Sequence, residues 1–332
     1  MKMPFGSRLT RWVSRPFQDC FGSSREKSVD IVKYADLRNN DMLLPVENGH
    51  GRKGVLIFRQ KINSGGTSFI YAGVTCISNI RYPVAFKVVK EKHRDLLLKE
   101  YMIMRSVWHE NILRVWGIYF SVRGSVVIMR MNLAYHRDLY SYISTMEGYA
   151  TEYLLDKWMR ELVSAISHVH ISGYIHGNLN YENVLLTKDL SIKVADFGSA
   201  DKKDTFRLTR YDPTFVPPEL KFRLSESIPH DYNPCLIDIW GVGVVLFFAL
   251  TKHLPFTEVV SMSATDVHGN CPGDTLLYQN DRKQCSASYV KVVSKLMDYN
   301  AGRRPQLFLV ICQNYFDEPQ NEEEPLDLEQ FS

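Results

Sequence analysis

The residues whose side chains are best suited to bind ligands or to take part in catalysis lie at the two ends of one short apolar hairpin. His176 and Asn183 precede the run Val184–Leu186, and the chain then turns through Thr187–Asp189 and returns to Asp196. A tight turn between two apolar runs brings their outer ends together, so we expect Asn183 and Asp196 to be neighbours. An amide oxygen and a carboxylate are hard ligands of the kind that Mg²⁺ accepts alongside phosphate oxygens. The spacing therefore predicts a site for a metal and a phosphate at the open end of the hairpin.

This stretch resembles the catalytic loop and the metal-binding loop of protein kinases. The family pattern H-R-D-L-K-x-x-N, followed by D-F-G, is met at His176, Leu179, Asn183, Asp196, Phe197 and Gly198. The pattern is broken at Gly177, Asn178 and Asn180. The resemblance implies that these three positions belong to an arginine that reads a phosphorylated activation segment, to the catalytic aspartate and to a lysine that faces the phosphate.

A second group of residues resembles the family's phosphate-binding strand. Val84-Ala85-Phe86-Lys87 is similar to the motif V-A-I-K, and Glu100 follows in a run with helical spacing. The resemblance implies that Lys87 binds the ATP phosphates and that Glu100 orients it. The turn at Gly65-Gly66 stands where kinases have a glycine-rich loop, but Gly-Gly alone is also typical of an ordinary hairpin turn.

The nucleotide site that the resemblance implies is lined by residues of the first 134 positions. Asn132 replaces the glutamate that is usual at the hinge, where backbone groups hold the adenine. The lining residues implied for ATP are Ile62, Gly65, Ile70, Ala85, Lys87, Glu100, Met131 and Leu133, with Asn183 and Asp196 for Mg²⁺.

Later motifs extend the resemblance to the end of the predicted domain. Pro217-Pro218-Glu219 is similar to the A-P-E motif, Asp238-Ile239-Trp240 begins a helix like the family's central one, and Arg304 is the expected partner of Glu219. Asp212 stands where Ser/Thr kinases carry a threonine beside the base. The Glu182-Asn183 ending favours Ser/Thr over Tyr as the substrate class.

The resemblance implies an α+β fold of two lobes. We expect an N-terminal tail and lead-in at residues 1–51, a kinase-like domain at 52–316 and an acidic disordered tail at 317–332. The small, mostly β lobe is expected at about 52–134 and the larger helical lobe at about 135–316. The polar segment Thr257–Ser288 is a candidate docking surface, although a variable connection is the better explanation.

Composition indicates the broad class of protein but not its function. Apolar residues make up 45% and charged residues 23% of the 332 positions, which is typical of a globular protein. A net charge of +3 gives no indication of nucleic acid as a partner. Trp240–Leu250, the longest apolar run, is far shorter than the roughly 20 residues of a membrane span, so we expect a buried helix.

Cysteine usage and the first residues bear on location. The six cysteines form no C-x-x-C pair and have no zinc-like histidine spacing, which favours a reducing compartment and a cytoplasmic protein. The basic, weakly amphipathic start would suit a transit peptide or a surface anchor, but its prolines and glycines favour a plain tail.

Two functions of different class remain open. Asn178 can preserve the shape of the loop, but a neutral amide cannot accept a proton as aspartate does. The leading hypothesis is a pseudokinase that binds ATP and Mg²⁺ and regulates or scaffolds a protein partner. The alternative is a Ser/Thr protein kinase of low activity, because phosphoryl transfer relies mainly on positioning and electrostatics.

Overall fold

The structure is a computed structural model that describes residues 42–48, 50, 53–77, 80–122, 125–208, 213–221, 231–255 and 287–312. Several sequence-based expectations concern other residues. The two predicted tails (apart from residues 42–48 and residue 50), Asp212 and nearly all of Thr257–Ser288 lie outside the described part of the chain.

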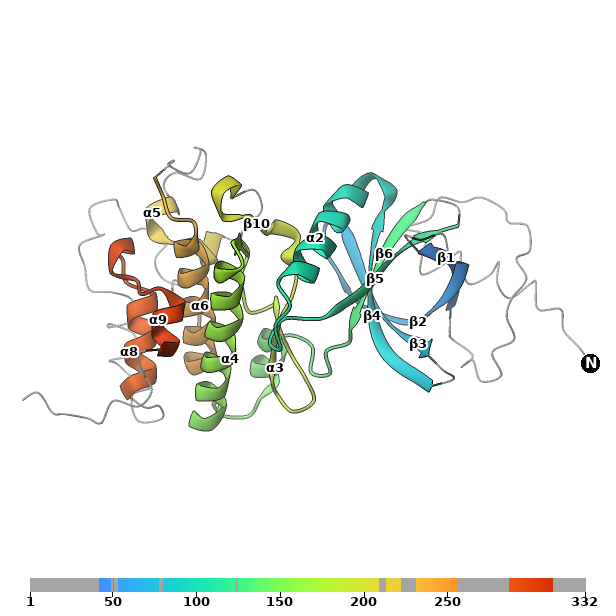
Figure 1. The fold of residues 1–332 in the computed structure, drawn as a ribbon. Helices are drawn as coiled ribbons and strands as arrows, with labels where there is room; N and C mark the ends of the chain where they lie inside the picture. The colour runs from blue at the N-terminus through green and yellow to red at the C-terminus, as the bar shows by residue number, and fades with distance from the viewer. Residues whose placement is uncertain are drawn as a thin grey trace, which may run out of the picture.

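A six-stranded antiparallel barrel forms the first lobe (Figure 1). Its strand order is β1-β2-β3-β4-β6-β5, closed by pairing of β1 with β5. The strands are β1 (Met42–Asn48), β2 (Lys53–Ser64), β3 (Ser68–Ile77), β4 (Ile80–Lys90), β5 (Val115–Ser121) and β6 (Val126–Asn132). Because β1 takes part in closing the barrel, the sheet begins within the segment expected as tail and lead-in, before the predicted boundary at residue 52.

Aromatic side chains fill the interior of the barrel. Phe58, Tyr71 and Phe86 are almost fully buried, and the Phe58 ring lies 4.5 Å from that of Phe86 and 5.6 Å from that of Tyr71. Gly73 allows this packing, since a Cβ there would lie 2.4 Å from the Phe86 ring and 2.3 Å from the carbonyl oxygen of Ile57. Together with Val46, Leu56, Val84, Val88, Val126 and Ile128, these rings form a separate hydrophobic core inside the barrel.

One helix, α2 (Arg94–Ser106), lies against the barrel beside β5 and β6 (Figure 1). It follows a short 3-10 turn, η1 (Glu91–His93). Its buried residues are Leu97, Glu100, Ile103 and Met104, at the spacing of a single helical face. Glu100 is therefore directed inward with three apolar neighbours, which places a carboxylate next to the sheet.

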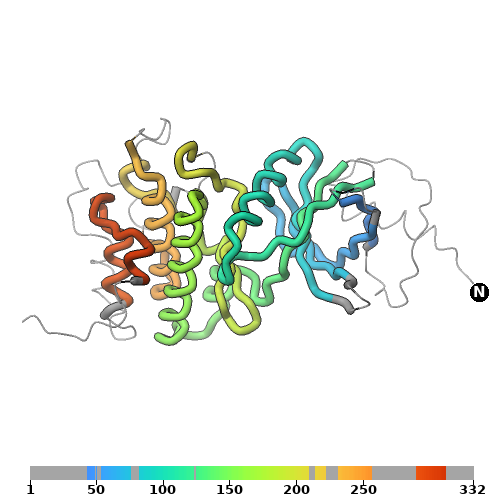
Figure 2. The backbone as a smooth tube through the Cα atoms, viewed as in Figure 1, coloured from blue at the N-terminus to red at the C-terminus, as the bar shows by residue number. Residues whose placement is uncertain are grey.

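Helices build the second lobe, which Figure 2 shows on the opposite side from the barrel. They are α3 (Leu139–Thr145), α4 (Glu152–Ile171), α5 (Pro218–Lys221), α6 (Cys235–Thr251), α8 (Ala287–Leu296) and α9 (Leu307–Cys312). The short two-stranded sheets are β7 (Tyr174–Ile175) with β10 (Asp201–Lys202) and β8 (Val184–Leu186) with β9 (Ile192–Val194). The fold is the expected α+β arrangement of two lobes.

The two longest helices of this lobe form its centre. Thr151 caps α4 by accepting a hydrogen bond from Leu154 N at 3.4 Å. In α6 almost every residue is buried, because α4 and α8 pack against it. No helix in the described part of the chain is long and apolar enough to cross a membrane.

Candidate functional site

The β8–β9 hairpin brings Asn183 and Asp196 to one end, as the sequence predicts. Val184 pairs with Val194 and Leu186 with Ile192. Just beyond the strands, Ala195 N donates to the Asn183 carbonyl oxygen at 2.8 Å. The pairing therefore continues for one residue beyond the strands. It places Asn183 beside Ala195, the residue directly before Asp196.

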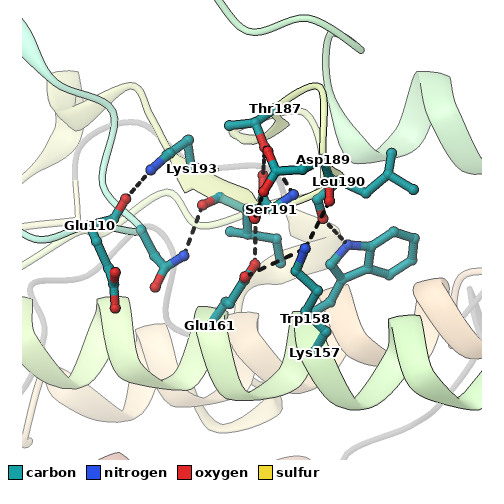
Figure 3. Close-up of polar contacts among 11 residues, drawn as sticks. Glu110, Lys157, Trp158, Glu161, Thr187, Asp189, Leu190, Ser191 and Lys193 are labelled. Atoms are coloured by element: carbon teal, nitrogen blue, oxygen red, sulfur yellow. Dashed lines mark hydrogen bonds and ion pairs between the residues drawn. The ribbon is translucent and has the colours of Figure 1, made fainter.

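Helix α4 fastens the other end of this hairpin (Figure 3). Lys157 Nζ and Trp158 Nε1 each donate to a backbone carbonyl oxygen of the turn at 2.8 Å. Ile192 N donates to Glu161 Oε2 at 2.6 Å, and burial raises the pKa of that carboxyl group. Successive turns of α4 therefore contact the hairpin, and these contacts fix the position of the end that carries Asn183 and Asp196.

The turn itself is closed by side chains. Thr187 Oγ1 and Ser191 Oγ each donate to a different oxygen of the Asp189 carboxylate at 2.7 Å (Figure 3). The hydroxyl hydrogen bonds lower the pKa of Asp189 to about 2. The sequence analysis recognised the turn but not this closure, although Ser, Thr and Asp at turn positions are its usual signal.

Lys87 lies at the centre of an ionic cluster. Its Nζ contacts both carboxylate oxygens of Glu100 at 2.8 Å and Oδ1 of Asp196 at 2.7 Å. The Lys87 and Glu100 side chains are 11% and 4% exposed, whereas that of Asp196 is 46% exposed. The predicted pair of Lys87 and Glu100 is present, and the contact with Asp196 joins the barrel and α2 to the second lobe.

Electrostatics keep this cluster charged. Burial alone would lower the pKa of Lys87, but the two carboxylates outweigh burial and raise it. For Asp196, burial opposes ionisation, yet the Lys87 ammonium holds the pKa below its usual value. Burial raises the pKa of Glu100, the least exposed member, against the pull of Lys87. A lysine that stays cationic and faces a partly open carboxylate can bind a phosphate group.

Asp196 has an unusual backbone. Its φ of 59° lies in the left-handed region, which non-glycine residues rarely adopt without a local reason. The 3-10 turn η2 (Phe197–Ser199) follows directly and contacts α2. Strain at this point turns the carboxylate toward Lys87 while the Phe197 ring packs against His176, with ring centroids 4.7 Å apart.

Asp238 of α6 organises the loop before the hairpin. The carboxylate is fully buried and accepts hydrogen bonds from His176 N at 2.8 Å, from Gly177 N at 2.9 Å and from His170 Nε2 at 2.9 Å. Burial would lower the pKa of His170, but Asp238 outweighs burial and raises it to about 9. These contacts join α6 and α4 to the loop that precedes the hairpin.

The three asparagines of the loop have different tasks. Asn180 Oδ1 accepts hydrogen bonds from Glu182 N at 2.9 Å and Asn183 N at 3.0 Å. Asn183 Nδ2 donates to the Asn178 carbonyl oxygen at 2.9 Å, which leaves its amide oxygen for a ligand. The family pattern identifies Asn180 only as a position where a cation is absent and does not reveal its role in closing the loop. Its signal is the preference of Asn for turns in which its side chain bonds the backbone two residues on.

An aromatic ring occupies the space next to Gly177. The glycine has φ of 74°, and a Cβ there would lie 2.6 Å from the ring of Phe206 and 3.1 Å from the Ser199 carbonyl oxygen. Nearby, Lys99 Nζ of α2 contacts Asp201 Oδ2 at 2.8 Å. At the position where the family has an arginine that binds a phosphorylated residue, this chain has Gly177. The chain after Gly198 is held instead by the packing of Phe206 and by the ion pair of Lys99 with Asp201.

The residues predicted to line the nucleotide site lie on adjacent strands. Ala85 pairs with Met131 across β4 and β6, and Ile70 pairs with Lys87 across β3 and β4. Ile62 is half-buried on β2, Leu133 packs at the edge of the main core, and Gly65 N donates to Ser68 O at 2.9 Å in the turn. The sheet thus places Ile70, Lys87, Ala85 and Met131 on neighbouring strands.

Asn132 has a partner that the sequence analysis did not identify. Trp116 Nε1 donates to Asn132 Oδ1 at 2.6 Å, and the Arg114 guanidinium lies 4.2 Å from the Trp116 ring centre. Asn132 N also donates to the Arg114 carbonyl oxygen at 3.0 Å. The hinge position is therefore tied to β5, a contact between distant residues that spacing alone does not reveal.

The predicted pair of Glu219 and Arg304 is confirmed. The guanidinium is bidentate on the carboxylate, with both N–O distances at 2.8 Å, and the Arg304 side chain is fully buried. Arg304 also lies 4.8 Å from the ring centre of Trp240 on α6. This pair joins α5, α6 and the chain before α9, away from the ionic cluster of Lys87.

A divalent metal can be accommodated at the hairpin. The Asn183 amide oxygen is available, and one oxygen of Asp196 faces Lys87 while the other remains for a ligand. The described residues contain no group of three or more His, Cys, Asp and Glu side chains that could hold a metal without other ligands. Such a donor set suits Mg²⁺, which is usually held by one or two protein oxygens together with substrate phosphates.

The two-lobed fold, the buried lysine–glutamate pair and the carboxylate on the facing hairpin are those of a protein kinase domain. The chain belongs to the protein kinase family, since the model of the protein kinase domain matches residues 57–316.

Curated relatives include several serine/threonine kinases. The chain is 26% identical over 339 residues to the hormonally up-regulated neu tumor-associated kinase of Mus musculus, covering 94% of this chain and 40% of that protein. It is 31% identical over 175 residues to CBL-interacting serine/threonine-protein kinase 24 of Arabidopsis thaliana, covering 52% and 37% respectively. The chain thus spans less than half the length of these relatives.

Proposed function

We propose that this chain is a pseudokinase, which binds ATP with Mg²⁺ but transfers phosphate poorly and serves as a regulatory or scaffolding module in signalling. The observation that carries the proposal is the contrast between an assembled cluster of Lys87, Glu100 and Asp196 and a loop with Asn178 at the position of the base. The residues that bind nucleotide in a kinase are present, whereas the residue that accepts the proton is replaced by Asn178.

The loop geometry supports weak transfer. Asn178 offers an amide in place of a carboxylate, and general base catalysis contributes about 10²–10⁴-fold to rate. Asn180 uses its side chain on the backbone of Glu182 and Asn183, so the loop has no cation there to face a transferring phosphate. These two differences act on the transition state rather than on nucleotide binding.

The second candidate is a Ser/Thr protein kinase of low activity. The names of the relatives favour it, and so does the ordered backbone of the loop, which Asp238 and Asn180 fix as firmly as a kinase would require. Positioning and electrostatics supply most of the catalysis of phosphoryl transfer, so the loss of a base need not end turnover.

Thermal unfolding with and without Mg-ATP tests nucleotide binding. A ligand that binds only the folded state stabilises it by about 2.7 kcal/mol at a hundredfold excess over Kd. We expect a clear rise in the melting temperature for the wild type and a much smaller rise for Asp196→Asn, which replaces the metal-binding carboxylate by a neutral amide at a partly exposed position. Equal shifts in both proteins, or none in the wild type, would contradict binding through this site.

A further inference from the structure

A pocket of about 280 Å³ lies behind α2, away from the ionic cluster of Lys87. Its floor is apolar and buried, formed by Met104, Ile112, Leu113 and Val115. Its rim is cationic and aromatic, formed by Arg105, Trp108, His109 and Arg114. We call this the α2 pocket. Nothing in the kinase chemistry described above uses it.

Two rim arginines are available for a ligand. Both are exposed, and within the described residues Arg105 has no hydrogen bond or ion pair, while the Arg114 guanidinium has only the face of Trp116. The Trp108 side chain is 63% exposed beside them, an unusual position for the largest apolar residue. Paired guanidinium groups above an apolar floor suit a segment that presents carboxylates and aliphatic side chains together.

The end of this chain has that composition. Residues 322–331 include Glu322, Glu323, Glu324, Asp327 and Glu329, with no lysine or arginine, and the apolar residues Leu326, Leu328 and Phe331. Leu326 and Leu328 alternate with Asp327 and Glu329. In an extended conformation, alternate residues point to opposite sides, so one side would be aliphatic and the other acidic.

We propose that the acidic segment 322–331 docks in the α2 pocket of its own chain. The leucines lie on the apolar floor, and the acidic side chains pair with the guanidinium groups of Arg105 and Arg114. Charge and apolar pattern match on both sides of this contact, which favours the segment over an uncharged apolar partner.

The tether is long enough. The last described helix, α9, packs against α4, and the pocket also adjoins α4, because His109 Nε2 lies 3.1 Å from Ser164 Oγ. Helix α4 has 20 residues, which corresponds to a length of about 30 Å. The residues from 313 to 326 (326 − 312 = 14) can span about 46 Å when extended. The segment can therefore reach the pocket without rearrangement of the described helices.

Docking would act on α2. The pocket is built from the last turn of this helix and the loop that follows it, and Glu100 on the same helix holds Lys87. An occupant of the pocket would therefore support the helix that positions the lysine. A protein that captured the acidic segment would withdraw that support, which provides a route from partner binding to the ionic cluster.

Carbodiimide coupling of the full chain tests where the segment lies. The double variant Arg105→Lys with Arg114→Lys keeps both charges and supplies amines that can couple to adjacent carboxylates. Peptide mass spectrometry of the monomer should detect coupling of these positions to residues 322–329, and coupling should fall at 1 M salt, where the Debye length is about 3 Å. No such coupling, coupling spread evenly over exposed lysines such as Lys92 and Lys188, or coupling only in a dimer would overturn the proposal.

Protease protection provides an independent readout. Cleavage by a Glu-specific protease within residues 322–329 should be at least threefold faster in Arg105→Glu with Arg114→Glu than in the wild type. The control Lys92→Glu with Lys188→Glu changes the net charge equally at exposed sites outside the pocket and should behave as the wild type. If the charge reversal prevents folding, Arg105→Gln with Arg114→Gln gives the same comparison. Equal cleavage rates in all folded variants would refute docking.

Discussion

At the scale of single residues, the loop around Asn178 lacks two charged groups of the family pattern but is held together by several hydrogen bonds. Asn180 no longer offers a cation, but its amide closes the loop through two backbone hydrogen bonds. Asp238 holds the same loop from α6 by accepting from two backbone amides and from His170. The result is a rigid loop without a proton acceptor, which is consistent with the proposed binding function and weak transfer.

The pair of His170 and Asp238 makes stability dependent on pH. The pKa of His170 is raised to about 9 in the folded chain, compared with about 6.5 in the unfolded chain. Its contribution is therefore fully present below pH 6.5 and is lost as the pH rises through 9. We expect the unfolding free energy of the wild type to exceed that of His170→Gln by roughly 3 kcal/mol more at pH 6 than at pH 10. Denaturant titrations at both pH values measure this difference, and a difference that is constant or grows with pH would contradict it.

At the scale of elements, the β8–β9 hairpin is positioned by α4. The sequence predicted the hairpin and the meeting of Asn183 with Asp196, because tight turns and strand pairs are local features. It did not predict the hydrogen bonds from Lys157 and Trp158 to the turn, which join residues about 30 positions apart. These contacts make the position of the metal ligands a property of α4 as well as of the hairpin.

Removal of one such contact should loosen the hairpin. Trp158→Phe keeps the apolar packing but leaves the carbonyl oxygen of Leu190 without its donor, which costs about 1–3 kcal/mol. We expect lower stability and faster hydrogen exchange at residues 184–194. Lys157→Met, which removes a more exposed donor to the same turn, serves as the control and should have the smaller effect. Unchanged exchange in Trp158→Phe would show that the hairpin does not depend on the Trp158 contact.

Other elements show where sequence reasoning ends. Spacing predicted the Lys87–Glu100 and Glu219–Arg304 pairs because the family motifs carry both partners. It did not reveal β1, whose proline weakens the strand pattern. The packing of Phe206 on Gly177 and the tie of Trp116 to Asn132 were also missed, since each depends on tertiary packing rather than on local pattern.

At the scale of the whole molecule, two ionic contacts among the described residues join the lobes. Lys87 of the barrel contacts Asp196, and Lys99 of α2 contacts Asp201, at 2.7 and 2.8 Å. The Lys87 side chain is buried, so its contact with Asp196 is the stronger of the two. The contact between Lys99 and Asp201 is exposed and is screened by salt. Of these two contacts, the one made by Lys87, the residue proposed to bind the ATP phosphates, is expected to contribute more.

The second lobe has its own structural pair. Arg304→Ala would leave the Glu219 carboxylate without its bidentate partner, and loss of one member of a buried pair costs about 3–5 kcal/mol. We expect reduced soluble yield and a lower melting temperature, with Arg303→Ala, at an exposed neighbouring position, close to the wild type. Normal melting of Arg304→Ala with altered nucleotide affinity would assign the pair to the nucleotide site instead.

Phosphate transfer under saturating Mg-ATP tests the central claim most directly. The measurement compares labelled phosphate incorporated into a generic protein substrate by the wild type, Asn178→Asp, Asn180→Lys and the double variant. The base alone is worth about 10²–10⁴-fold, or roughly 3–5 kcal/mol. We expect little gain in either single variant and a gain in the double variant that exceeds the sum of the two, because each residue supplies what the other lacks. Wild-type turnover equal to that of the double variant would contradict the pseudokinase assignment.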